Sequence, residues 1–208
     1  MPDGAASSLG PAAAALLRAW VAELVAAPGL TAIDDPAEAW LRHVEEALQV
    51  VPLLDAAPPG PLVDVGAGGG SVGIPLAVAL PGRELVLVEA ERRKCEFLEK
   101  WATRLPNVRV VWGRVEEQGV DWAAVAVAKA LAPPPVAAEW LLPLVAPGGL
   151  AVLFVGPTAD LAAVAAVAER LCAEPVAGPP GLAVLRKTGP TPPGFPRRVG
   201  AARKRPLA

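Results

Sequence analysis

Apolar runs alternate with helical patterns along the chain after a proline-rich break at residues 56–60. The apolar runs cover residues 61–65, 84–89, 108–112, 122–128, 149–155 and 181–187. Helical patterns lie between them over residues 71–80, 91–104, 135–145 and 159–172. Near-continuous apolar strands are typical of parallel strands that helices cover on both faces. The pattern therefore predicts an α/β fold of the Rossmann-like type, with a doubly wound, mostly parallel sheet.

Two further helices are predicted ahead of this alternation, over residues 11–27 and 36–50. Asp34 or Asp35 can cap the second of these helices, and Pro36 suits its first turn. The sequence thus predicts N-terminal helices that precede the sheet.

Three segments follow from these patterns. They are an N-terminal helical extension packed on the core (residues 1–58), a core (59–188) and a basic, proline-rich C-terminal arm (189–208) that is expected to be extended. With 208 residues and 53% hydrophobic residues, the chain can bury one sizeable core. Five of the six tryptophans are expected to pack in that core, namely Trp20, Trp40, Trp112, Trp122 and Trp140.

Charge is distributed unevenly around a formal net charge of −2. From Arg186 onward there are seven basic residues and no acid, whereas residues 1–185 carry 12 basic and 21 acidic residues. A basic tail on an acidic body indicates contact with a polyanion, or a solvated tail that aids solubility.

Several classes of protein are disfavoured by the same residues. Cys95 and Cys172 are the two cysteines, and no CxxC or HxxxH spacing occurs, so neither a disulfide framework nor a metal site is expected. The apolar N-terminal stretch lacks a basic leader, and later apolar stretches fall short of the roughly 20 residues of a membrane span. A cytoplasmic protein without a membrane segment is expected.

A glycine-rich turn, "VDVGAGGGSVG", follows the first predicted strand. In a doubly wound sheet, ligands bind where strands end, and glycine permits left-handed backbone and close approach. Glu89 ends the second strand, 23 residues after Gly66, where an acid can accept hydrogen bonds from ribose. A dinucleotide, S-adenosylmethionine and a turn without any ligand each fit this pattern.

Asp64 favours one of these alternatives. Residues 68–73 read as GxGxxG, yet a carboxylate beside the loop would repel a pyrophosphate at the following helix N-terminus. S-adenosylmethionine carries cationic sulfonium and ammonium groups there instead. The turn therefore suits a methyl donor better than a dinucleotide, and Glu116, after the third strand, is placed to bound an adenine.

Five motifs occur in one order along residues 12–208: "LTAIDDPAEAWLRHVEEAL", "VDVGAGGGSVGIPLA", "ERRKCEFLEK", "GRVEE" and "FPRRVGAARKRPL". Together they resemble the glucose-inhibited division protein B family, the bacterial 16S rRNA guanine-N7 methyltransferases. The resemblance implies a class I fold, S-adenosylmethionine as cofactor, and methylation of a guanine in 16S rRNA, by family analogy at RNA position 527 in a decoding-region loop. The implied partner is 16S rRNA or the 30S subunit, and a monomer is expected.

The resemblance also implies roles for individual residues. For the cofactor it implies Gly66, Ser71, Glu89, Val115, Glu116 and Lys129, and the glycine turn itself adds Asp64, Gly68 and Gly70 as candidate cofactor-binding residues. Lys129 and His43, the latter in an Arg-His pair with Arg42, are the implied catalytic residues. Arg197, Arg198, Arg203, Lys204 and Arg205 are expected to grip RNA phosphates, and removal of the arm is expected to spare binding of the methyl donor.

The sequence departs from the family pattern at three places. Lys129 stands where the family has arginine, which retains a charge but loses the planar, bidentate fork. An asparagine-rich motif usual after a tryptophan is replaced by the apolar stretch that follows Trp20, and Ala47 replaces a serine.

The implied chemistry asks little of the side chains. Guanine N7 carries a lone pair and no proton, so methylation there needs alignment rather than a general base. Three other functions stay open at this point: a small-molecule methyltransferase, a nicotinamide oxidoreductase, and a catalytically silent RNA-binding relative.

Overall fold

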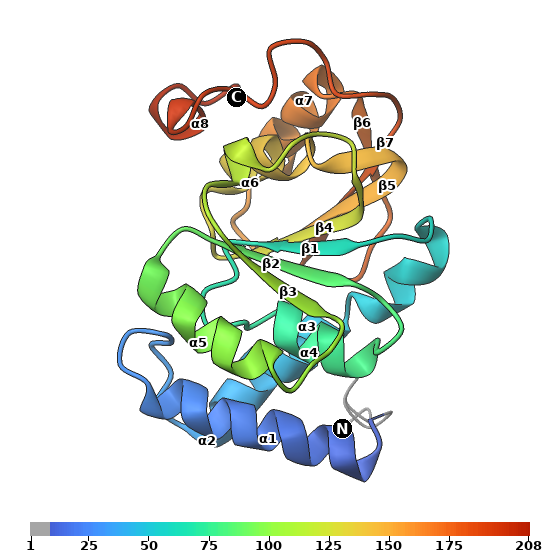
Figure 1. Ribbon diagram of the computed structural model, residues 1–208. Helices are drawn as coiled ribbons and strands as arrows, with labels where there is room; N and C mark the ends of the chain where they lie inside the picture. The colour runs from blue at the N-terminus through green and yellow to red at the C-terminus, as the bar shows by residue number, and fades with distance from the viewer. Residues whose placement is uncertain (1–8) are drawn as a thin grey trace.

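The computed structural model describes residues 9–208, and one seven-stranded sheet forms its centre (Figure 1). The strands are β1 (Leu62–Val65), β2 (Leu85–Glu89), β3 (Val108–Trp112), β4 (Ala123–Lys129), β5 (Val145–Phe154), β6 (Ala173–Val176) and β7 (Leu182–Lys187). Their order in the sheet is β3-β2-β1-β4-β5-β7-β6. β1 to β5 are mutually parallel, and β7 runs antiparallel to its neighbours β5 and β6. The predicted doubly wound, mostly parallel sheet is confirmed.

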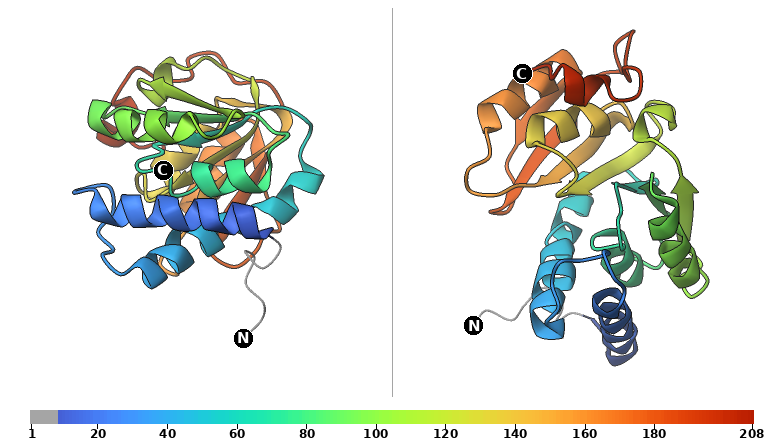
Figure 2. Two further views of the ribbon diagram at one scale, coloured as in Figure 1. Left: turned by 60° about the horizontal axis from the view of Figure 1, so that its bottom comes forward. Right: turned by 90° about the vertical axis from the view of Figure 1, so that its left-hand side faces the viewer.

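Helices cover both faces of this sheet (Figures 1 and 2). They are α1 (Pro11–Ala26), α2 (Pro36–Ala39), α3 (Glu46–Leu48), α4 (Gly73–Ala79), α5 (Arg92–Ala102), α6 (Pro134–Leu141), α7 (Leu161–Arg170) and α8 (Ala201–Lys204). A π-helical turn, Trp40–Glu45, joins α2 to α3, and 3₁₀ turns occupy Val51–Ala56 and Val115–Glu117.

Alternate side chains of the strands belong to two separate apolar layers, one on each face of the sheet. Leu62 packs with residues of α1 to α5, whereas the next residue, Val63, packs with residues of α6, α7 and α8. Because successive side chains of a strand point to opposite faces, a strand buried on both sides must be apolar at every position. All four residues of β1 are buried, although one of them is Asp64. A buried carboxylate adds nothing to apolar packing, so Asp64 indicates a polar role at this end of the sheet.

The N-terminal helices lie against the glycine turn of the core. Trp20 of α1 is fully buried, and its indole Nε1 donates to the carbonyl of Gly69 at 3.1 Å. A Cβ built on Gly69 would lie 2.2 Å from Cδ1 of Leu24, which also belongs to α1. The glycine at position 69 is therefore required by the packing of α1. The first eight residues of the predicted N-terminal extension lie outside the described residues.

Three features differ from the sequence-based expectation. Trp112 is 58% exposed rather than in the core, because it ends the edge strand β3, which has a neighbouring strand on one side only. Arg92, the first residue of α5, stacks over its ring. Trp40 and Trp122 are only half-buried. The arm is not simply extended, because it contains α8, whose Ala201 and Ala202 are buried against the core.

A polar network fixes the root of the arm. Lys187, at the end of β7, is 1% exposed, and its Nζ donates to the carbonyl of Leu142 and the hydroxyl of Thr191. Asp121 accepts from both the backbone N–H and the hydroxyl of Thr191. Burial lowers the pKa of Lys187, and the carboxylate of Asp121 opposes that shift. The chain therefore leaves the sheet in a defined direction.

The structure identifies Asp35 as the cap of the second predicted helix, since its carboxylate accepts from the N–H groups of Ala37 and Glu38. Asp35→Ala is expected to lower the free energy of unfolding by about 1 kcal/mol. Asp34→Ala, at the exposed neighbouring position, is the control and should change it by less than about 0.5 kcal/mol. Urea unfolding of both variants measures the difference, and equal effects would contradict this assignment.

Candidate functional site

The glycine turn after β1 uses left-handed backbone at three positions. Gly66, Gly68 and Gly70 have φ values of 68°, 59° and 89°. A Cβ on Gly66 would lie 2.3 Å from Cδ1 of Leu131, and one on Gly70 would lie 2.4 Å from Cγ1 of Ile74. At Gly68 the nearest atom would be a carbonyl oxygen at 3.9 Å. Packing therefore requires glycine at positions 66 and 70, whereas the side of Gly68 that a Cβ would occupy is free of other protein atoms.

Glu89 holds this turn against the end of β2. Its side chain is almost entirely buried, and its carboxylate accepts from the backbone N–H groups of Gly68, Ala90 and Glu91, each at 2.8 Å. An ionised carboxylate offers about four acceptor positions. One position therefore remains for a further donor.

Asp64 lies beneath the turn rather than at its open side. The residue is 2% exposed, and its Oδ2 accepts from the N–H of Gly73 at 2.8 Å, at the start of α4. Burial raises the pKa of Asp64 to about 7, and the charge of Glu89 acts in the same direction. The structure thus gives Asp64 a supporting position, which differs from the direct approach to a cationic ligand that the sequence suggested.

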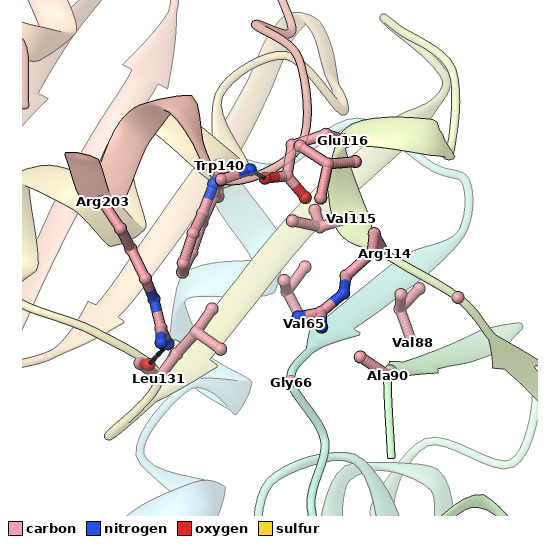
Figure 3. Close-up of a pocket in the computed structure, with 13 residues that line it drawn as sticks. Val65, Gly66, Val88, Ala90, Arg114, Val115, Glu116, Leu131, Trp140 and Arg203 are labelled. Atoms are coloured by element: carbon pink, nitrogen blue, oxygen red, sulfur yellow. Dashed lines mark hydrogen bonds between the residues drawn. The ribbon is translucent and has the colours of Figure 1, made fainter. Parts of the chain in front are cut away.

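A hollow, here called the edge hollow, opens at the carboxyl ends of β1 to β4 (Figure 3). Its lining residues are Val65, Gly66, Val88, Ala90, Gly113, Arg114, Val115, Glu116, Leu131, Trp140, Val199, Gly200 and Arg203. Of the residues that the sequence assigned to a cofactor, Gly66, Val115 and Glu116 are thus brought together. Gly68, Gly70 and Ser71 belong to the adjoining turn.

The C-terminal arm forms one wall of the edge hollow. The N–H of Gly200 donates to Oε1 of Glu116 at 3.0 Å. The guanidinium of Arg203 donates to the carbonyl of Leu131 at 3.2 Å and lies 5.2 Å from the centre of the Trp140 ring. Figure 3 shows Arg203 on one side of the hollow and Arg114 on the other. The arm is therefore part of this site, and its removal is not expected to leave the hollow intact.

Arg197 anchors the arm to α6. Its Nε and Nη2 donate to the two carboxylate oxygens of Glu139 at 2.5 and 2.6 Å, and Nη2 also donates to the carbonyl of Arg205. The side chain of Glu139 is only 3% exposed. Of the five arm cations that the sequence assigned to RNA, Arg197 is thus bound to a buried acid and Arg203 lines the hollow. Arg198, Arg203, Lys204 and Arg205 are exposed.

A second hollow, here called the lysine hollow, lies at the ends of β4 and β5. Its lining residues are Arg42, Glu46, Gln49, Lys129, Ala130, Phe154, Val155, Gly156, Pro157, Pro180 and Gly181. Nζ of Lys129 contacts Oε2 of Glu46 at 2.7 Å and donates to the carbonyl of Arg42. The π-helical turn Trp40–Glu45 carries Arg42, and such turns often occur at functional sites.

One strained residue lies between a lining residue of each hollow. Ala130 has φ 52°, an uncommon conformation for a residue with a side chain. Its neighbour Lys129 lines the lysine hollow, whereas Leu131 lines the edge hollow. Backbone strain of this kind is concentrated at functional sites. The chain at the end of β4 therefore contributes residues to both hollows.

His43 is held in a neutral form. Its Nε2 lies 3.0 Å from the hydroxyl of Thr31, and its ring meets the ring of Trp20 edge-on. Burial lowers the pKa of His43 to about 4, and the positive charge of Lys129 adds to this effect. Within residues 9–208, Nδ1 of this ring has no hydrogen-bond partner. The imidazole is therefore placed as a neutral packing group one residue from Arg42.

Sequence reasoning did not identify Leu131, Trp140 or Gly200 as site residues. Leu131 follows the Lys129 motif by two positions, so the motif itself could have suggested it. Trp140 and Gly200 line the hollow from α6 and the arm, and no local sequence pattern indicates that these segments lie beside the glycine turn.

In the part of the chain that the structure describes, no group of three or more His, Cys, Asp or Glu residues could hold a metal ion. No helix within residues 9–208 has the length and apolar character needed to cross a membrane.

Residues 13–172 match the GidB family model, described as rRNA small subunit methyltransferase G. Ribosomal RNA small subunit methyltransferase G of Synechococcus elongatus is 35% identical over 211 residues, which cover 86% of this chain and 82% of that protein. The protein of the same name from Moorella thermoacetica is 33% identical over 197 residues, again covering 86% of this chain and 82% of that protein.

Solved structures show the same fold at low identity. M. jannaschii TYW2 in complex with AdoMet has a TM-score of 0.55 at 15% identity, covering 69% of this chain and 72% of that chain. A TehB-like SAM-dependent methyltransferase from Corynebacterium glutamicum has a TM-score of 0.52 at 19% identity, covering 69% of this chain and 87% of that chain. The sheet and its helices are thus those of class I methyltransferases.

The anchoring of the arm can be tested through Arg197. Arg197→Ala leaves the buried carboxylate of Glu139 without its cation, so the free energy of unfolding is expected to fall by about 3–5 kcal/mol. Arg198→Ala, the exposed neighbour, should change it by less than about 0.5 kcal/mol. Chemical denaturation compares the two variants. A loss in Arg197→Ala as small as that in Arg198→Ala would show that the pair does not anchor the arm.

Proposed function

The chain belongs to the rRNA small subunit methyltransferase G family, and we propose that it methylates N7 of a guanine in 16S rRNA with S-adenosylmethionine. The observation that carries the proposal is the edge hollow. In a chain of this family, it is lined by Gly66, Val115 and Glu116, the residues to which the family resemblance gives the methyl donor. The hollow lies at the carboxyl ends of the strands, where ligands of doubly wound sheets bind.

The residues of the site fit a nucleoside. Val65, Val88, Ala90 and Val115 supply apolar surface in the edge hollow, which suits an adenine ring, and the carboxylate of Glu116 borders it. Gly68 leaves room for close approach to the backbone. The remaining acceptor position of Glu89 suits a ribose hydroxyl. These features support the assignment of the cofactor to this side of the sheet.

When bound, S-adenosylmethionine supplies an electrophilic methyl group on a sulfonium sulfur. Guanine N7 carries no proton, so no side chain of this protein has to remove one. The neutral state of His43, with a pKa of about 4, agrees with a reaction that needs no titrating base near neutral pH. The protein's contribution is to hold the acceptor and the donor in alignment, which can lower the barrier by about 7–11 kcal/mol.

Lys129 retains the positive charge that the family places at the end of β4. Its side chain is 15% exposed and is held by Glu46 and the carbonyl of Arg42. A fixed ammonium beside the lysine hollow would contact the RNA near the target base. We assign Lys129 this role in place of the family's arginine, without the bidentate geometry.

The exposed cations of the arm are the groups that we assign to phosphate contacts. Arg198, Lys204 and Arg205 are exposed and do not line the edge hollow. Arg197 binds Glu139, and Arg203, although exposed, donates to the carbonyl of Leu131. An rRNA substrate, naked or in the 30S subunit, would place the protein in the cytoplasm.

The proposed function is tested by methyl transfer from labelled S-adenosylmethionine to 30S subunits that lack N7-methylguanosine, with the modified position mapped. Label at a single guanine is expected. A parallel assay with Lys129→Arg, which restores the family residue, controls for the departure at that position. Absence of label from both proteins, together with measurable donor binding, would favour a small-molecule methyltransferase or a silent relative.

Two glycine variants test the donor site. Gly68→Ala places a methyl group where no protein atom lies, so we expect a loss of about 1–2 kcal/mol in the free energy of unfolding from the left-handed backbone. Its affinity for S-adenosylmethionine should fall by at least about tenfold, because the methyl group occupies the approach to the loop. Gly70→Ala should lose more stability, since its Cβ would collide with Ile74.

Calorimetric titration with S-adenosylmethionine and urea unfolding give both quantities for each variant. Donor affinity of Gly68→Ala equal to that of the unmodified protein would show that the donor does not approach this turn.

A further inference from the structure

The lysine hollow has a composition that phosphate binding does not explain. It contains two cations, Arg42 and Lys129, and also the carboxylate of Glu46. A site that only grips phosphates gains nothing from an acid, because a carboxylate repels them. The acid in this hollow therefore suggests a ligand that donates hydrogen bonds.

Glu46 is held firmly but not fully used. Oε1 lies 2.5 Å from Nη1 of Arg42, and Oε2 lies 2.7 Å from Nζ of Lys129. The side chain of Glu46 is 26% exposed. Since an ionised carboxylate has about four acceptor positions, each oxygen retains one position for a further donor. The hollow thus presents two adjacent acceptors, fixed by cations on either side.

We propose that the lysine hollow receives the target guanine and that Glu46 selects it by accepting hydrogen bonds from its N1–H and N2–H₂ groups. These two donors lie side by side on the Watson–Crick edge, which matches the two free positions of the carboxylate. N7 lies on the Hoogsteen edge, which does not include these two donors, and stays free for methylation. The inference rests on the proposed function and adds the group that selects the base.

The same contacts explain discrimination against other bases. Adenine carries an unprotonated N1, whose lone pair would face the carboxylate, so one hydrogen bond would become a repulsion. A site built to receive hydrogen bonds rejects an analogue that cannot donate them by far more than an apolar pocket can. The charge of Glu46 therefore serves selection rather than affinity for RNA.

The remaining walls suit a base taken out of its stack. Phe154 lines the hollow, and Nζ of Lys129 lies 5.6 Å from the centre of its ring. Aromatic side chains commonly stack on unpaired RNA bases. Lys129 lines this hollow and Leu131 lines the edge hollow, so both hollows border the same short segment after β4. A guanine here would therefore lie on the side of that segment away from the proposed donor site's lining residue Leu131, two residues along the chain.

The test compares guanosine with inosine at the methylated position, in 16S rRNA joined from synthetic and transcribed pieces and assembled into 30S subunits. Inosine lacks the N2 amino group and retains N7. For the unmodified protein, kcat/KM is expected to be about 10- to 100-fold lower with inosine, as for the loss of a hydrogen bond to a charged group. For Glu46→Gln, kcat/KM with guanosine should fall by about the same factor, and the preference for guanosine over inosine should shrink at least about fivefold.

Glu38→Gln, an exposed change in α2 outside the hollow, is the matched control and should keep the full preference for guanosine. A Glu46→Gln variant that loses activity equally on both substrates would overturn the proposal, because Glu46 would then only position Lys129. Equal rates of the unmodified protein on guanosine and inosine would overturn it without any variant. Failure of the unmodified protein to methylate the guanosine substrate would instead reject the proposed function, and this inference with it.

Discussion

The site depends on one carboxylate, that of Glu89, which holds the turn after β1 against the end of β2. Three backbone N–H groups converge on it at 2.8 Å, and one of them belongs to Gly68. A buried charge is tolerated only when it is paired or well hydrogen-bonded, and these amides supply that compensation. Asp64 does the same from below by accepting the N–H of Gly73 at the start of α4. Two acids therefore fix both ends of a turn that its glycines alone would leave free to move.

Local pattern predicted the sheet well because each strand carries its own signal. Strands covered on both faces are apolar throughout, so β1, β2 and β4 are recognisable without knowledge of their neighbours. Exposure is not a local property, and Trp112 was misplaced because it ends an edge strand, which lacks a neighbouring strand on one side. The short strand β6 and the one-turn helix α8 were missed for a related reason. Each is too short to show a period and is stabilised by the element on which it packs.

In the candidate site, too, the features with a local sequence pattern could be predicted and the long-range contacts could not. The glycine turn and Glu89 could be predicted, since a strand followed by glycines places them at one edge of the sheet. The bonds between Lys129 and Glu46 and between Arg197 and Glu139 could not, because they join residues far apart in the chain. Arg197 shows the consequence: the sequence displays a cation in a basic run, whereas the fold buries its partner. Net charge of a segment therefore overstates how many of its cations are available to a ligand.

The arm is both a wall of the edge hollow and the carrier of four exposed cations, Arg198, Arg203, Lys204 and Arg205. Gly200 is bonded to Glu116 in that wall, two residues from Arg198 and four from Lys204. Whatever polyanion binds those cations and displaces the segment must change the hollow as well. Thermodynamic linkage makes such an effect reciprocal: a molecule in the hollow alters the affinity of the polyanion by the same factor. The two binding events are then one equilibrium, in which the loss of either ligand changes the retention of the other.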